Sequence, residues 1–315
     1  MTSAVSWIRN ASRALFRFEP FHCRTWEAVV LRLVFAWLAV SLILTAPPTL
    51  PGTPYPHGLA HFMDLGFLRD ATTVHWLSLT ATIALVLGAL GIAEPLTLGW
   101  TLFVVIASKS YNQSQGAIGH AGQLLTLCLL AQWMASVWAL RKKGAGLRGL
   151  VWGGVESWKR QVWWITQTIA AGYTVSACTK LINSDFTWPF RGANFLLQIL
   201  KAHEENRASY LGQPGEFAQW IVQVLTHHPV LGNLMLIPAF LLEFLAFLAL
   251  LNRRMSVVFG LGLLAFHKMT DLVMAIDFGS HQDLLWLFFV NPVYWIGAAI
   301  LLGRSRFRVV RQAQC

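Results

Sequence analysis

Lys180 is the residue of this sequence whose type and position most clearly suggest chemistry. It stands near the end of an apolar segment, residues 163–182, that is long enough to cross a membrane. An ammonium group held in hydrocarbon costs about 3 kcal/mol on insertion scales, so an ionisable residue at such a place is a candidate for function. The structural alternative is a lysine whose side chain extends to the lipid surface. Position alone does not separate the two.

Two other apolar segments carry ionisable residues in their interior. Glu243 lies in the middle of one, and the next contains His267, Lys268 and Asp271. His267 and Asp271 are four positions apart and therefore share one face of a helix. Here too a structural interpretation stands beside the functional one: Glu243 pairs with Lys268 across the bundle, and His267 is an interior histidine with its hydrogen bonds satisfied.

A polar run, residues 111–116 with the sequence YNQSQG, precedes another apolar segment. Asn112 and Gln115 belong to it, and His120 follows four residues later. Amides and an imidazole at the end of a membrane span are suited to hydrogen bonding with a ligand in a water-poor site.

The composition assigns these residues to a helical membrane protein, since 56% of the chain is hydrophobic, 12% is charged and 15 residues are Trp. The predicted fold is an all-α, polytopic transmembrane helical bundle of about eight spans. Each predicted span approaches the roughly 20 residues that cross a bilayer. The spans are 27–46, 73–93, 95–111, 118–140, 161–182, 230–251, 256–275 and 281–303.

Basic residues orient this bundle. With the N-terminus inside, 16 of the 24 Lys and Arg residues fall in cytoplasmic loops or tails, 5 fall outside, and Arg32, Lys180 and Lys268 fall within spans. Both termini are therefore expected in the cytoplasm, and Lys180, His120 and His267 gather toward the outer side. Because the positive charge follows topology, nucleic-acid binding is not expected.

The predicted organisation is a cytoplasmic amphipathic segment over 1–26, a transmembrane domain over 27–303 and a basic cytoplasmic tail over 304–315. The longest outer segment, 183–229, has apolar residues at helical spacing, which predicts two short surface helices, one of them able to cap a cavity. The four cysteines have no metal-type spacing and no HExxH motif occurs, so no metal is expected.

The order of these pieces resembles the membrane domain of the vitamin K-dependent gamma-carboxylase family, which includes the bacterial horizontally transferred transmembrane (HTTM) group. The pieces that carry the resemblance are residues 112–120, residues 173–188 (YTVSACTKLINSDFTW), Glu243, and residues 265–269 (AFHKM). The resemblance spans 27–303. Its most specific part is the Lys-Leu pair at Lys180 with Trp188 downstream.

The resemblance implies roles for individual residues. Lys180 matches the lysine taken as the base that deprotonates reduced vitamin K, His120 a histidine that assists, and His267 a supporting histidine. A reduced quinone of the vitamin K type is the implied cofactor, and no metal is implied. The residues expected to bind quinone or substrate are Asn112, Gln115, Tyr173, Trp188, Glu243 and Asp271. Burial disfavours an ammonium, as a neutral amine base requires.

Three functions follow as alternatives. The first is a quinol-linked carboxylase or oxygenase of the bacterial inner membrane, a lyase-like enzyme acting on a secreted peptide or protein. The second is a membrane factor that matures or exports an antimicrobial peptide of the sporulation-delaying-toxin type. The third is a noncatalytic scaffold or transporter in which the charged residues are structural pairs. The segment 183–229 is far shorter than the lumenal region by which eukaryotic carboxylases bind a propeptide.

Overall fold

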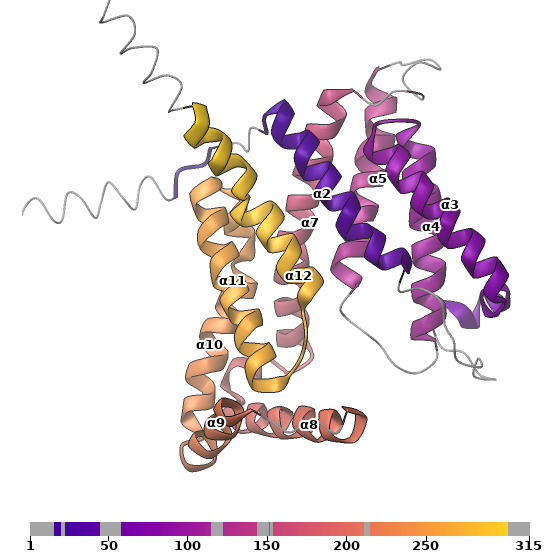
Figure 1. Ribbon diagram of the computed structural model, residues 1–315. Coiled ribbons are helices and arrows are strands. Elements are labelled where there is room, and N and C mark those ends of the chain that lie inside the picture. The colour runs from indigo at the N-terminus through magenta and orange to yellow at the C-terminus, as the bar shows by residue number, and fades with distance from the viewer. Residues whose placement is uncertain are drawn as a thin grey trace, which may run out of the picture. The chain divides into compact units, whose positions relative to one another are not determined.

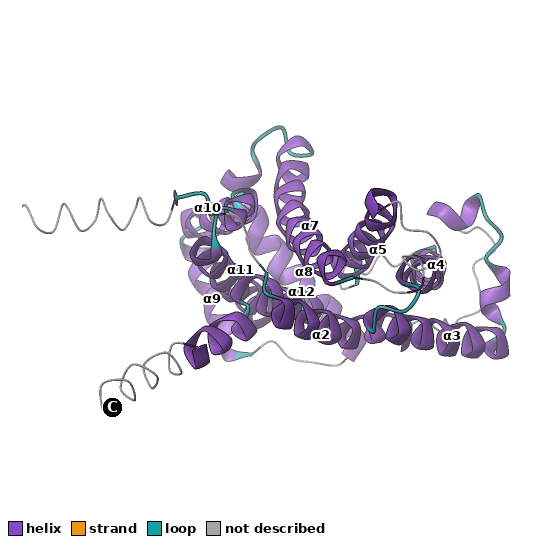
Figure 2. Cartoon of the chain, turned by 90° about the horizontal axis from the view of Figure 1, so that it is seen from above, coloured by secondary structure: helices purple, strands orange, loops and turns teal. Residues whose placement is uncertain are grey.

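The computed structural model describes residues 16–19, 23–44, 58–114, 122–143, 151, 154–210 and 215–301. These residues form helices and their connections, and Figure 2 draws no strand among them. The α-helices, with their bounds, are α2 (Thr25–Leu44), α3 (Ala71–Ala89), α4 (Glu94–Gln113), α5 (Gln123–Lys143), α7 (Val155–Ile182), α8 (Gly192–Tyr210), α9 (Glu216–His227), α10 (Val230–Phe244), α11 (Arg253–Met274) and α12 (Gly279–Leu284). A π-helical segment, residues 285–290, and a helix over 292–301 follow α12.

The chain is a polytopic helical membrane protein. Among the residues that the structure describes, five stretches are long and apolar enough to cross a membrane: Thr25–Ile43, Ala71–Ala89, Gln123–Arg141, Arg253–Met274 and Gly279–Leu301. The pair α9 and α10, bent by 117° at its break, would make a sixth if it formed one span. This is fewer than the eight predicted. Helices α4 and α7 are 20 and 28 residues long but carry more polar side chains, and they are not among these stretches.

The helices divide into two compact units. The Lys180 unit contains the described residues of Met1–Phe21 and Thr166–Leu285, and the Arg32 unit those of His22–Ile165 and Trp286–Cys315. Helix α7 is continuous across residue 166 and contributes its first part to the Arg32 unit and its second part to the Lys180 unit. Most of the N-terminal segment and all of 304–315 lie outside the described residues.

In the Arg32 unit, α3 and α4 form an antiparallel hairpin (Figure 1). Asp70 begins α3 by accepting a hydrogen bond from the Thr73 amide, as an N-cap residue does. The turn that follows places Gly91 at φ +87°, and Pro95 lies at the start of α4, where its missing N–H costs nothing.

A buried ion pair holds four helices of this unit together. Arg32 Nη2 lies 2.8 Å from Glu94 Oε1, and their side chains are 1% and 2% exposed. The Glu94 carboxylate also accepts hydrogen bonds from Trp158 Nε1 and Gln161 Nε2, at 2.7 and 2.8 Å. Arg32 donates to the carbonyl of Gly88 and its guanidinium lies 4.6 Å from the Trp158 ring centroid. The network therefore joins α2, α3, α4 and α7.

In the Lys180 unit, α10 and α11 run side by side, and α8 and α9 lie across one end of them (Figure 1). Asn252 begins α11 by accepting hydrogen bonds from the amides of Arg254 and Met255. The two short helices predicted within 183–229 are α8 and α9. One face of α9 is apolar, with Ile221 and Leu225 buried against Ile199 of α8.

Candidate functional site

Lys180 meets Glu243 within the Lys180 unit. Helix α7 places Lys180 in its last turn, and α10 places Glu243 one residue before its end. Lys180 Nζ donates a short hydrogen bond to Glu243 Oε2. The Glu243 side chain is 7% exposed and that of Lys180 29%. A carboxylate this deeply buried is stable only with a partner, so the pair fixes both side chains in place.

Trp188 also contacts the ammonium of Lys180. Its ring centroid lies 5.0 Å from Lys180 Nζ, which is a cation–π distance. The indole also packs at 6.2 Å against the ring of Phe240, one turn before Glu243 on α10. The ammonium is thus held between one carboxylate and one aromatic face.

A second polar group lies deeper in the same unit. Tyr173 Oη and His267 Nε2 are 2.6 Å apart, and both residues are buried. The His267 ring packs 4.7 Å from the Phe278 ring and 5.8 Å from the His281 ring, and Tyr173 lies 6.5 Å from His281. His267 Nδ1 is buried and has no hydrogen-bond partner among the described residues. The cluster therefore contains a buried polar atom whose hydrogen-bonding capacity no described residue satisfies.

Helix α7 connects the two groups. Tyr173 and Lys180 are seven residues apart, so they lie on similar sides of α7, separated by roughly 10 Å along its axis. The site thus takes Tyr173 and Lys180 from α7, Glu243 from α10 and His267 from α11. Such an arrangement of base, acid and imidazole can accept and pass a proton in a water-poor setting.

Other predicted site residues lie elsewhere. Asp271 forms an ion pair with Lys268 at 2.6 Å on the same helix, and the Lys268 side chain is 60% exposed. The pairing of Glu243 with Lys268 expected across the bundle is therefore wrong, because each residue has a nearer partner of opposite charge. Asn112 lies near the end of α4, in the Arg32 unit. Gln115 and His120 lie outside the described residues.

Phe278 and His281 were given no catalytic or binding role from the sequence, although His281 was among the polar residues expected on the outer side. They follow the end of α11, and their rings pack against each other at 5.5 Å. A spacing of three residues between two rings after the His267 helix was the signal available, although it is too common to identify a site by itself. Arg32 was expected within a span, but its pairing with Glu94 was not predicted.

Within the part of the chain that the structure describes, no three His, Cys, Asp or Glu side chains cluster as a metal ion would require. Comparison of the chain with protein-family models, with curated proteins and with solved structures finds no match.

Proposed function

We propose that this protein is a quinol-linked membrane enzyme in which Lys180 is the base, similar in mechanism to the membrane domain of the vitamin K-dependent gamma-carboxylases. The observation that carries the proposal is the position of Lys180, held by Glu243 and Trp188 in the unit that contains the candidate span Arg253–Met274. A lysine extending to the lipid surface would not have both partners.

The residues of the site fit an aromatic ligand that carries oxygen atoms. Trp188 offers a flat face beside the ammonium, and the buried Nδ1 of His267 offers a polar atom to a hydroxyl or carbonyl group. A reduced quinone of the vitamin K type would supply, with oxygen, the driving force for removing an otherwise unreactive proton. The substrate of that removal would be a carbon acid of a secreted peptide or protein.

The chain's own part is to move and hold protons. Lys180 Nζ, once its proton has passed to Glu243 Oε2, is a neutral amine that accepts a proton from the ligand. Glu243 holds the first proton as a neutral acid during this step. Once Glu243 has released that proton to solvent, its carboxylate again pairs with the ammonium. Tyr173 orients the imidazole of His267 through its hydrogen bond to Nε2, so that Nδ1 faces away from Tyr173. His120 keeps its sequence-based role as an assisting residue, and Asn112 and Gln115 keep theirs as residues that bind quinone or substrate.

Turnover by the purified protein in lipid nanodiscs tests this function. Oxygen uptake and quinone-epoxide formation are followed with reduced vitamin K and with menaquinol, comparing wild type, Lys180→Ala and Lys201→Ala. Lys201 is a matched control, because it is a lysine of the same unit whose ion pair with Glu205 is on the surface. Epoxide formed by wild type and Lys201→Ala but not by Lys180→Ala supports the proposal. Wild-type protein that turns over no quinol would contradict it.

A second function, a noncatalytic scaffold or transporter, is favoured by one observation. Lys180 and Glu243 satisfy each other, and such a pair also serves as a tie between two helices. Replacing both residues by apolar ones distinguishes the two functions. If the pair is purely structural, the double variant keeps both its stability and its cellular function.

The basic residues support a location in a bacterial cytoplasmic membrane with both termini in the cytoplasm, which places Lys180 toward the outer side. Reporter fusions at residue 1 and residue 315, and thiol labelling of a cysteine introduced at Lys201, test this orientation. An external N-terminus would overturn it.

A further inference from the structure

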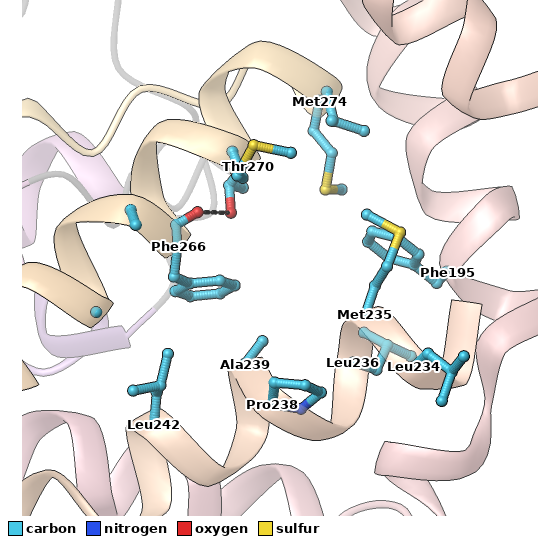
Figure 3. A pocket seen from close by; sticks show the side chains of 14 residues that line it. Phe195, Leu234, Met235, Leu236, Pro238, Ala239, Leu242, Phe266, Thr270 and Met274 are labelled. Carbon is cyan, nitrogen blue, oxygen red and sulfur yellow. Dashed lines mark hydrogen bonds between the residues drawn. The ribbon is translucent and has the colours of Figure 1, made fainter. Parts of the chain in front are cut away.

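An apolar cavity of about 410 Å³ lies between α8, α10 and α11 of the Lys180 unit. Figure 3 shows its walls: Phe266 extends into it from α11, Met235 and Ala239 face it from α10, and Phe195 bounds it from α8. The volume is within the range of sites that bind small molecules, roughly 300 to 1,000 Å³.

The lining allows only an apolar occupant. It includes no charged side chain, and its one hydroxyl, that of Thr270, already donates to the carbonyl of Phe266 at 3.0 Å. Met235, Met269 and Met274 contribute unbranched thioether side chains, which adapt to an irregular apolar guest. A ligand recognised here is therefore flexible and made of hydrocarbon.

The position of the cavity indicates the source of that hydrocarbon. Its α11 wall is a candidate membrane span, and α10 belongs to the bent pair that would form another. At the other wall, α9 packs against α8 and exposes Phe217 and Trp220, as helices at the headgroup level of a bilayer do. The cavity thus extends from the expected headgroup level into the apolar part of the bundle.

A positive charge stands at the same wall. Arg191 is exposed directly before α8, and its carbonyl accepts the backbone hydrogen bond of Phe195, one turn later. Its guanidinium donates to Thr187 Oγ1 at 2.7 Å and to the Ser184 carbonyl at 3.3 Å. The other N–H groups of this side chain remain for a phosphate whose attached chain passes Phe195, about 5.4 Å away along one helical turn.

We propose that this cavity binds one acyl chain of a membrane phospholipid, with the phosphate toward Arg191. The lipid is a resident of the bundle and is bound whether or not the protein turns over a quinol. The cavity and the polar site occupy neighbouring faces of the same two helices, because Leu242 lines the cavity next to Glu243 and Phe266 lines it next to His267. Consecutive helical residues point roughly 100° apart.

Photolabelling tests the assignment without any measurement of turnover. Full-length protein is reconstituted with a phosphatidylethanolamine that carries a diazirine in the middle of one acyl chain, irradiated, digested and sequenced by mass spectrometry. The expected result is labelling concentrated on peptides that contain Met235, Met269 and Met274. Excess unlabelled phospholipid should reduce it several-fold.

Two variants of α11 test whether the labelling depends on the space inside the cavity. Ala265→Trp places an indole in the cavity from an exposed position, whereas Leu261→Trp places one on the exposed part of α11 outside the lining. Ala265→Trp should lower labelling at the three methionines at least fivefold and Leu261→Trp should leave it unchanged, with equal elution in size exclusion. Arg191→Gln should weaken competition by phospholipid relative to a headgroup-free hydrocarbon.

If Ala265→Trp does not fold, the labelling pattern of the wild-type protein is sufficient to test the lipid assignment. Labelling spread evenly over the exposed faces of α2, α3 and α11 would overturn it, since that pattern describes lipid that only surrounds the protein. Labelling displaced by menaquinone but not by phospholipid would overturn it as well, because the occupant would then be an isoprenoid chain.

Discussion

Lys180 and Glu243 are 63 residues apart in the chain, yet the ammonium of one donates its hydrogen bond to the carboxylate of the other. The two partners are unequally protected, with side chains 29% and 7% exposed. This asymmetry predicts how the bundle responds when either is removed.

Lys180→Met should destabilise the protein by about 3 to 5 kcal/mol, because it leaves a buried carboxylate without a partner. Glu243→Gln should cost less, since the half-buried lysine can extend toward a polar environment. The double variant Lys180→Met/Glu243→Leu should cost less than the sum of the singles. Thermal unfolding in detergent measures all three, with Lys201→Met/Glu205→Leu as the surface control, expected within about 0.5 kcal/mol of wild type. Additive costs would mean that the two groups are not coupled.

Tyr173→Phe should destabilise the protein by about 1 to 3 kcal/mol, because it leaves the buried Nε2 of His267 without its partner at 2.6 Å. Under the proposed function it should also lower turnover while leaving the Lys180–Glu243 pair intact. Unfolding and single-turnover measurements on the same preparation separate the two effects. A variant as stable as wild type would show that His267 finds another partner.

Arg32→Lys should be far from conservative. It loses the planar group that stacks on Trp158 and that bonds to both Glu94 and the Gly88 carbonyl, so a cost above 2 kcal/mol is expected. The exposed pair Lys159–Glu156 offers the control, and Glu156→Gln should change stability by less than about 0.5 kcal/mol. If both substitutions had the same effect, the buried network would contribute nothing beyond a surface ion pair.

Asp70 predicts a pH effect on α3. Hydrogen bonds from the Thr73 hydroxyl and amide lower the pKa of this carboxyl below its usual 3.8. A lowered folded-state pKa means that the cap contributes its full stability above about pH 4, and that the contribution disappears as the pH falls through the lower folded value. Asp70→Asn keeps the capping oxygen without the titration. As the pH falls from 4 to 2.5, the stability of Asp70→Asn relative to wild type should therefore rise. A difference in stability that stays constant over this range would contradict the assignment.

The helices could largely be predicted from the sequence, because long apolar runs leave few alternatives to membrane-type helices. The partners of the charged residues could not. A pairing of Lys268 with Glu243 was weighed as the structural alternative because both lie in apolar segments, yet Lys268 pairs with Asp271, three residues away on the same helix. Glu94, the first residue of α4, likewise gave no sign in the sequence that it faces Arg32. Helices that are apolar on most sides do not reveal which neighbour each face meets. Helix α9 is the opposite case: because only one of its faces is apolar, its place at the surface was predictable.

The separation of Lys180 from Glu243 has a consequence for biosynthesis. A ribosome adding about 5 to 20 residues per second makes Glu243 some 3 to 13 seconds after Lys180. If α7 enters the bilayer during that interval, it does so with an unpaired ammonium, at a cost of about 3 kcal/mol. Translocation of α10 would then complete the insertion of α7, so the two helices would enter the bilayer as one cooperative event rather than in the order of their synthesis.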